Sequence, residues 1–308
     1  MKSLIKKKLK FIHIGHHKTG STFIQQQVIP NLVQFKQPSG KNKFNLSDID
    51  YRKALIDICT KTVGNFDKHI VNKQFQKKEF NCISHEGFVG FSKASGSGHQ
   101  FESTAKNLFS VFEVDDIILV IRNQKDLVRS LYIDDIEYGY TCSFKKWLNI
   151  KVEHNQLDWL KFHDIIKIYS DVFGSNKVNV ILYEDLFNLE TRMETLKKFF
   201  RKNKVSEKEF KKLNFEIRSN PSLNFPAVYV SRLLNYFIGT HANYAEGFLY
   251  KLWYKKLMKT FSRYINFSST KKISKIKEFD SILNSLFSKD NIKTSKLIKK
   301  NLNKYNYP

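Results

Sequence analysis

The chain has 308 residues, which is enough to bury a sizeable core in one large or two small domains. Its 41% hydrophobic and 14% aromatic residues exclude general disorder. No apolar run approaches the roughly 18 residues of a membrane-spanning helix. The formal net charge of +24 attracts anions such as nucleic acid, anionic lipid, acidic glycan or a phosphorylated cofactor. A general bias toward lysine is the alternative explanation of this charge.

Four short apolar runs predict strands. They cover residues 10–15, 80–84, 114–121 and 178–183, and the third is the richest in β-branched residues. Helical patterns lie between and after them, over residues 21–29, 48–62, 103–111, 124–138, 154–173, 189–203, 225–238, 247–264 and 270–305. Continuous apolar strands that alternate with helices indicate a parallel sheet covered on both faces.

We therefore predict an α/β fold, a P-loop-like open parallel sheet flanked by helices. We expect a single domain over residues 1–308. Its core covers about residues 10–205, and a helical C-terminal extension covers about residues 206–308. Residues 92–99 (SKASGSGH) have the composition of a flexible loop.

The cysteines and the first residues of the chain help to predict the cellular compartment of the protein. Cys59, Cys82 and Cys142 are widely spaced and form no CxxC pair, so we expect neither a disulfide scaffold nor a zinc site. The basic start lacks the apolar region of a signal peptide. We expect a cytoplasmic protein, with a peripheral contact to the inner face of the membrane as a further option.

A glycine-containing turn joins the first predicted strand to the first predicted helix. Its residues are Gly15, His16, His17, Lys18, Thr19, Gly20, Ser21 and Thr22. Glycines allow a sharp turn in which successive N–H groups face one anion, and the helix N-terminus and the lysine add positive charge. The turn predicts a phosphate or sulfate site, and the alternative is an ordinary turn with a solvated lysine. The lysine precedes the second glycine, unlike in the GxxxxGK[ST] loop of nucleotide triphosphatases.

A second polar pair, Arg122-Asn123, follows the third predicted strand. Ligands of open α/β sheets bind at the carboxyl ends of the strands, and an arginine there is suited to bidentate contact with phosphate. Ser130 follows eight residues after Arg122 and offers a hydroxyl. The alternatives are an ion pair of Arg122 with a nearby aspartate and a surface position for Ser130.

The two motifs together resemble a known family. FIHIGHHKTGSTFIQ is similar to the 5′-phosphosulfate-binding loop of sulfotransferases that use 3′-phosphoadenosine 5′-phosphosulfate (PAPS), especially the carbohydrate-type and bacterial branches. IILVIRNQKDLVRSLY resembles the 3′-phosphate-binding segment of that family, with the same spacing from arginine to serine. VILYEDL resembles its strand-to-helix turn, and IRSNPSLNF and SKDNIKTSKL are weaker resemblances.

The resemblance implies a role for each matched residue. Lys18 would contact the phosphosulfate and its bridging oxygen. Apart from the resemblance, His16 and His17 could contact the sulfate or the acceptor. Arg122 and Ser130 would hold the 3′-phosphate, and Tyr183 would lie against the adenine. The donors to the 5′-phosphate would be Thr19, Gly20, Ser21 and Thr22. The co-substrate is then PAPS, and the acceptor is expected to be the hydroxyl or amine of a carbohydrate or glycolipid.

The chain also departs from the family. Phe23 stands where cytosolic members usually have tryptophan, and Gln124 stands where proline commonly follows Arg-Asn. The basic, glycine-containing segment that closes over the nucleotide in cytosolic members is not recognisable. Its part could be taken by residues further along the chain, Arg218, Asn220 or Ser222.

The transfer also needs a base for the acceptor proton, and Ser84-His85-Glu86 follows the second predicted strand. Glu86 is the first candidate, because several glycan-modifying members use a glutamate, and His85 is the second. Partial burial is expected to raise the pKa of Glu86, and Lys18 to lower it. The alternative for Glu86 is a capping or salt-bridge carboxylate. His13 is predicted to be a packed, hydrogen-bonded core residue.

Other classes of function are weaker alternatives. No divalent metal is expected, because no strand ends in a convincing magnesium-binding aspartate and no His/Cys cluster is evident. This and the displaced lysine disfavour a P-loop kinase or other nucleotide-binding protein. A nucleic-acid partner is not expected, because no recognition element stands out. Residues 251–264 (KLWYKKLMKTFSRY) could dock on an anionic membrane, or pack an apolar helix face on the core.

Overall fold

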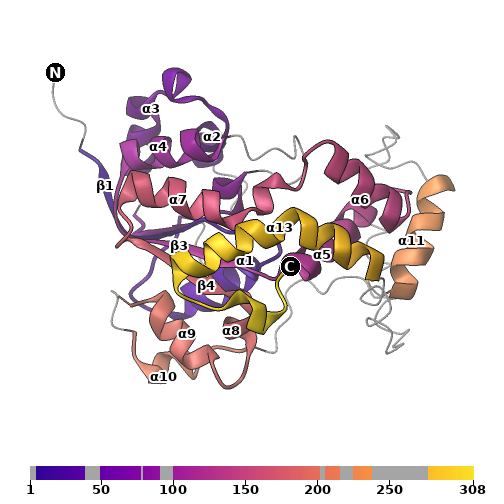
Figure 1. The fold of residues 1–308 in the computed structure, drawn as a ribbon. Coiled ribbons are helices and arrows are strands. Elements are labelled where there is room, and N and C mark those ends of the chain that lie inside the picture. The colour runs from indigo at the N-terminus through magenta and orange to yellow at the C-terminus, as the bar shows by residue number, and fades with distance from the viewer. Residues whose placement is uncertain are drawn as a thin grey trace.

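The computed structural model describes residues 5–38, 49–77, 79–90, 100–201, 205–215, 225–237 and 277–308. At its centre lies a four-stranded parallel sheet in the order β2–β1–β3–β4 (Figure 1). The strands are β1 (Lys7–His13), β2 (Cys82–Ser84), β3 (Phe112–Ile121) and β4 (Val178–Leu182). All four predicted strands are confirmed within a few residues, and so is the open parallel α/β fold.

Both faces of the sheet are buried, which explains the continuous apolar runs. In β3, Ile117, Leu119 and Ile121 belong to one hydrophobic cluster, and Ile118 and Val120 belong to a second cluster on the opposite face. Because side chains alternate along a strand, a strand that is covered on both faces needs apolar residues at every position. Figure 1 shows α4 and α7 on one side of the sheet and α8, α9 and α10 on the other.

Helices connect the strands and continue after the last one. They are α1 (Ser21–Phe23), α2 (Ile49–Thr60), α3 (Lys68–Gln76), α4 (Phe101–Val111), α5 (Gln124–Glu137), α6 (Phe144–Glu153), α7 (Phe162–Phe173), α8 (Tyr183–Phe187), α9 (Arg192–Phe199), α10 (Glu207–Phe210), α11 (Phe225–Phe237) and α13 (Lys277–Ile298). Short helical turns η1 (Ile24–Val28), η2 (Ile29–Asn31), η3 (Val63–Asn65), η4 (Glu86–Val89), η5 (Asp158–Leu160) and η8 (Leu302–Tyr305) complete the described elements. The α13 helix packs on α5 and α7, so the C-terminal part contacts the helices that cover the sheet.

One helix prediction was wrong in its start, and the helices α3, α6, α8 and α10 were not predicted. The helix expected over residues 154–173 begins only at Phe162, because Asn155 adopts a left-handed conformation (φ 53°) that ends the preceding α6. Asparagine tolerates this conformation better than most residues. The α3 helix was not predicted; Asp67 caps it by accepting hydrogen bonds from the N–H groups of His69 and Ile70.

Several predictions fall outside the described residues. These are the loop at 92–99, the basic apolar segment at 251–264, and Arg218, Asn220 and Ser222. Among the helices of the described ranges, none is both long enough and apolar enough to cross a bilayer. Cys59, Cys82 and Cys142 are all free thiols.

The strand order positions the candidate site. From β1 the chain passes to β2 on one side and then returns to β3 on the other side, so the order reverses between β1 and β3. Ligands of open α/β sheets bind in the crevice at such a switch point, outside the carboxyl ends of the strands. The glycine-containing turn follows β1, Glu86 follows β2, Arg122 and Ser130 follow β3, and Tyr183 follows β4.

Candidate functional site

The turn after β1 has a backbone that glycine makes possible. Gly15 (φ 98°) and Gly20 (φ 85°) adopt positive φ, and so does Lys18 (φ 60°). A Cβ on Gly20 would lie 2.8 Å from the ring of Phe187, and one on Gly15 would lie 3.1 Å from the Cα of Glu86. These two positions therefore combine an unfavourable backbone for other residues with a lack of space.

Hydroxyl groups close the turn internally. Thr19 Oγ1 donates to the carbonyl oxygen of His16 at 2.7 Å, and Ser21 Oγ donates to the same oxygen at 2.9 Å. Both side chains are buried, so in this arrangement their hydroxyls hold the turn together. The backbone N–H groups at the start of α1 have no intrahelical acceptor, and they are the donors that suit an anion.

Lys18 is paired with a residue that sequence reasoning missed. Its ammonium nitrogen lies 2.6 Å from Oδ1 of Asp134 on α5. Ser130 lies one helical turn before Asp134, so the two residues share the face of α5 that is turned toward Lys18. No hydrogen bond from the Ser130 hydroxyl to another described residue is present. The place of Ser130 in the helix after β3 was predicted, whereas the pairing of Lys18 with Asp134 across more than a hundred residues leaves no signal in the sequence.

Arg122 joins the second motif to the first. Its Nη1 donates to the carbonyl oxygen of Lys18 at 2.9 Å. Its guanidinium also lies over the ring of Tyr183, with Cζ 4.4 Å from the ring centroid. The geometry therefore brings the segments after β1, β3 and β4 together at one end of the sheet.

His17, in the turn after β1, contacts Glu86, in the segment after β2. His17 Nδ1 lies 2.9 Å from Glu86 Oε2, and His17 Nε2 donates to the carbonyl oxygen of Gly90 at 3.1 Å. Because a carbonyl oxygen can only accept, Nε2 carries a proton in this contact. The pair thus holds the histidine ring and one carboxylate oxygen in a fixed orientation.

The expected effect of burial on the Glu86 pKa is confirmed, but the groups that lower this pKa were not predicted. Burial raises this pKa, but the hydrogen bond and charge of His17, the hydroxyl of Ser21 and the nearby His13 outweigh burial. The net result is a pKa below the ordinary value of 4.5. Glu86 is therefore ionised at neutral pH, in the state that accepts a proton.

His85 is fixed in a neutral state. Its Nδ1 accepts a hydrogen bond from the N–H of Gly87 at 3.1 Å, which caps η4. Burial lowers the pKa of His85 to about 4. With Nδ1 occupied as an acceptor, the remaining proton of the neutral ring lies on Nε2, so this histidine is poorly suited to be the base.

Two further histidines of this region are fully buried. His13 lies 2.7 Å from the hydroxyl of Ser84, and the prediction of a packed, hydrogen-bonded core residue is confirmed. Neither ring nitrogen of His16 has a hydrogen-bond partner in the described part of the chain, and the ring packs between Trp159 and Phe162. Burial lowers the pKa of His13 to about 4 and that of His16 to about 3.

One cluster elsewhere has the composition of a metal site. Potential ligand atoms of His163, Asp164 and Asp290 lie within 4.8 Å of one another. However, Asp290 accepts hydrogen bonds from the N–H of His163 and the hydroxyl of Thr294, each at 3.4 Å. The Lys161 side chain does not cap α7, so Asp290 takes this role from α13, and the cluster has a structural explanation.

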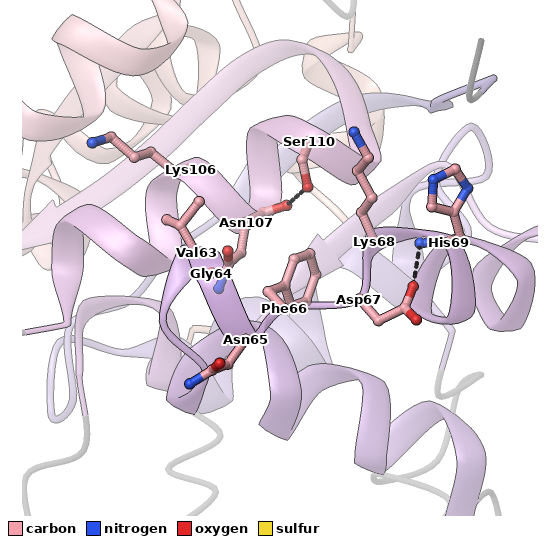
Figure 2. Close-up of a pocket in the computed structure, with 10 residues that line it drawn as sticks. All are labelled: Val63, Gly64, Asn65, Phe66, Asp67, Lys68, His69, Lys106, Asn107 and Ser110. Carbon is pink, nitrogen blue, oxygen red and sulfur yellow. Dashed lines mark hydrogen bonds between the residues drawn. The ribbon is translucent and has the colours of Figure 1, made fainter. Parts of the chain in front are cut away.

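A hollow of about 560 Å³ lies between the segment 63–69 and α4 (Figure 2). Its polar groups serve local structure. The Ser110 hydroxyl donates to the carbonyl oxygen of Asn107, Asp67 caps α3, and Lys106 pairs with Glu102 (Figure 2 draws the first two). None of its lining residues is a site residue that the sequence predicts.

Comparisons with known proteins give distant matches only. The chain matches no protein-family model and no curated protein. Among solved structures it is similar to a sulfotransferase from Alicyclobacillus acidocaldarius (14% identity, TM-score 0.47, covering 97% of this chain and 99% of the other). It is also similar to the sulfotransferase domain of the olefin synthase from Synechococcus PCC 7002 (12% identity, TM-score 0.34, covering 85% of this chain and 98% of the other).

Proposed function

We propose that this protein is a PAPS-dependent sulfotransferase. It transfers the sulfuryl group of PAPS to a hydroxyl or amine, and a carbohydrate or glycolipid is the acceptor class that the motif resemblance favours. The observation that carries the proposal is the contact between the two motifs. The hydrogen bond from Arg122 to the carbonyl oxygen of Lys18 puts the cation proposed for the 3′-phosphate beside the turn proposed for the phosphosulfate.

The proposed donor site uses residues from three strand ends. The backbone N–H groups of the turn, together with Lys18, receive the 5′-phosphosulfate. Arg122 and Ser130 bind the 3′-phosphate, since a guanidinium supplies paired donors to phosphate oxygens. Tyr183 already stacks on Arg122 and presents an aromatic surface for the adenine. His17 lies beside the turn, where it can contact the sulfate or the acceptor.

The proposed reaction is a direct in-line transfer. The acceptor oxygen forms a bond to sulfur, and the bond between sulfur and the bridging phosphate oxygen breaks. The electron pair of that bond leaves with 3′-phosphoadenosine 5′-phosphate (PAP), and Glu86 takes the acceptor proton. His17 orients the Glu86 carboxylate through their 2.9 Å contact.

Lys18 is proposed to stabilise the leaving group. Negative charge develops on the bridging oxygen as the bond to sulfur breaks, and a fixed ammonium group lowers the energy of that state. In the structure this ammonium is paired with Asp134. Donor binding must therefore compete with the aspartate for Lys18.

Thermal stabilisation tests the nucleotide specificity. The protein is heated alone, with PAP, with ATP and Mg²⁺, or with duplex DNA. A ligand that binds only the folded state raises the unfolding temperature, so we expect the largest increase with PAP. An increase only with ATP and Mg²⁺ would indicate a kinase, and an increase only with DNA would indicate a nucleic-acid-binding protein.

Transfer itself is tested with radiolabelled PAPS. Cell extract is incubated with the labelled donor, with and without the protein, and the labelled products are separated and identified. We expect a product that depends on the protein and carries the label on a sugar. A labelled product of another chemical class would support sulfuryl transfer by this protein and would change the proposed class of acceptor.

A further inference from the structure

Glu184 lies close to Arg122 but pairs with neutral groups. Its Oε1 accepts the backbone N–H of Asn123 at 2.8 Å, and its Oε2 accepts the hydroxyl of Tyr307 at 3.1 Å. Arg122 stacks on Tyr183, so the pairs Arg122-Asn123 and Tyr183-Glu184 face each other. Within the described ranges, no carboxylate lies at ion-pair distance from the guanidinium of Arg122.

This arrangement affects what Arg122 can bind. A carboxylate that is free to turn toward an adjacent guanidinium forms a charge-assisted, often bidentate pair with it. Such a pair would compete with an anionic ligand for the same N–H donors. In the structure the N–H of Asn123 and the hydroxyl of Tyr307 each donate to one oxygen of Glu184, and together they fix the orientation of this carboxylate.

We propose that Tyr307 is a positioning residue that holds Glu184 away from Arg122 and so keeps the guanidinium available to the 3′-phosphate of the donor. The inference rests on the proposed function and adds a specificity determinant to it. Tyr307 acts through Glu184 and need not touch the nucleotide.

The segment that carries Tyr307 is well anchored for this role. The Tyr307 side chain is buried, and its ring packs near Phe162. On one side of it, Asn123 Nδ2 donates to the carbonyl oxygen of Tyr305 at 2.8 Å. On the other side, Asn291 Nδ2 donates to the carbonyl oxygen of Pro308 at 2.9 Å. The backbone around Tyr307 is thus fixed independently of its hydroxyl.

The test measures discrimination between PAP and adenosine 5′-phosphate, which lacks the 3′-phosphate. Dissociation constants for both are determined by calorimetry for the wild type and for Tyr307→Phe. The variant keeps the ring and removes the hydroxyl. We expect its preference for PAP to fall by about tenfold, with little change for adenosine 5′-phosphate, because a competing ion pair affects only the 3′-phosphate subsite.

A matched control and a rescue separate positioning from general stability. Tyr305→Phe removes a hydroxyl from the same segment, one that donates to Asp185 at 2.7 Å, and should leave the preference for PAP unchanged. Adding Glu184→Gln to Tyr307→Phe removes the competing charge and should restore the preference. An unchanged preference in Tyr307→Phe, or an equal loss in Tyr305→Phe, would overturn the inference.

Two further outcomes distinguish a failure of the Tyr307 inference from a failure of the proposed function and from a variant that does not fold. A wild type that does not prefer PAP over adenosine 5′-phosphate contradicts the proposed function itself, whatever the variants do. If Tyr307→Phe does not fold, Glu184→Gln alone provides the test. An amide oxygen can still accept from the N–H of Asn123, so we expect affinity for PAP at least equal to that of the wild type. A tenfold loss, about the effect of one charged hydrogen bond, would overturn the inference.

Discussion

At the candidate site, each cation of the two motifs lies near a carboxylate, and the structure treats the two cations differently. Lys18 is directly paired with Asp134, which is largely buried. Arg122 has a nearby carboxylate in Glu184, but that group is held by neutral donors. Among the described residues, the guanidinium of Arg122 has no carboxylate partner, so an anion can bind it directly. The ammonium of Lys18 must first leave Asp134.

The Lys18–Asp134 pair predicts the effect of Asp134→Asn on donor binding. The substitution removes the competing charge and keeps a similar shape, so we expect the affinity for PAP to rise by about threefold to tenfold. Calorimetric titration with PAP measures this. Asp126→Asn, which removes a carboxylate 3.3 Å from Arg129 on the same helix, is the control and should have no effect. Weaker binding by Asp134→Asn would show that the aspartate orients Lys18 and does not compete.

The proposed base makes a separate prediction for the transfer rate. Glu86→Gln keeps the hydrogen-bonding size of the side chain but cannot take the acceptor proton, so kcat should fall about a hundredfold or more. Affinity for PAP, measured by titration, should stay within about twofold, because the proton transfer does not contribute to ground-state binding. Glu79→Gln, at an exposed glutamate 2.9 Å from Lys36, should retain full activity. A kcat for Glu86→Gln near that of the wild type would reject this assignment.

The charge of Glu86 should also affect how the free energy of unfolding depends on pH. Because the folded-state pKa of Glu86 is lowered, its stabilising contribution is present above the unfolded value near 4.5 and is lost as the pH falls through the folded pKa. Wild type should therefore exceed Glu86→Gln in unfolding free energy at pH 6 to 7, with the difference shrinking below about pH 4.5. Urea unfolding across this range measures it. A constant difference would mean that the charge of Glu86 does not contribute.

The residues that the sequence could predict are those whose roles depend on local chain geometry. Glycine at Gly15 and Gly20, Lys18 between them, and Arg122 after an apolar run all carry a local signal. Asp134 and Tyr307 were not predicted, because their roles depend on partners 116 and 123 residues away. The His17 contact that lowers the pKa of Glu86 was also not predicted, since folding creates it.

At the scale of elements, the strands were predictable and some helices were not. Burial on both faces gives each strand a continuous apolar run, which is visible without knowledge of its neighbours. The break between α6 and α7 depends instead on a single left-handed residue, Asn155. The short α3 has few apolar residues, and its start depends on the capping side chain of Asp67.

The turn after β1 predicts a sharp contrast between two glycine substitutions. Gly20→Ala adds a Cβ 2.8 Å from Phe187 at a backbone with φ 85°, so we expect a loss of about 1–3 kcal/mol in stability and weaker binding of PAP. Gly64→Ala adds a Cβ with nothing within 4 Å and no positive φ, and should change neither. Urea unfolding and titration with PAP measure both effects. Equal behaviour of the two variants would show that the turn does not need its observed backbone.

At the scale of the whole molecule, the net charge affects encounters with anionic ligands and self-repulsion, whereas the buried histidines affect how stability depends on pH. The net charge of +24 favours encounters with an anionic donor and also raises self-repulsion in the folded state. Self-repulsion grows as acidic pH protonates the carboxylates. The buried His13 and His16 add a second, more specific sensitivity to acid, because the folded protein keeps both rings neutral.

This sensitivity gives a prediction for acid unfolding. The pKa of His13 is lowered from 6.5 to about 4, and that of His16 from 6.5 to about 3. Between pH 6.5 and these folded-state values, the unfolded chain therefore binds protons that the folded chain does not. Unfolding free energy should therefore fall with decreasing pH, by up to about 1.4 kcal/mol per unit for each histidine. His16→Leu removes one of these protons and should reduce the slope between pH 6.5 and 4 by about that amount, measured by urea unfolding.

The same variant has a second expected effect near neutral pH. Neither ring nitrogen of His16 has a partner among the described residues, so an apolar side chain of similar size should maintain or increase the unfolding free energy at pH 7. Ile14→Leu, at a fully buried position two residues away, is the control for altered packing and should leave the slope unchanged. If His16→Leu keeps the wild-type slope, the imidazole must be able to take up a proton in the folded protein, which means that water or a polar group reaches it there.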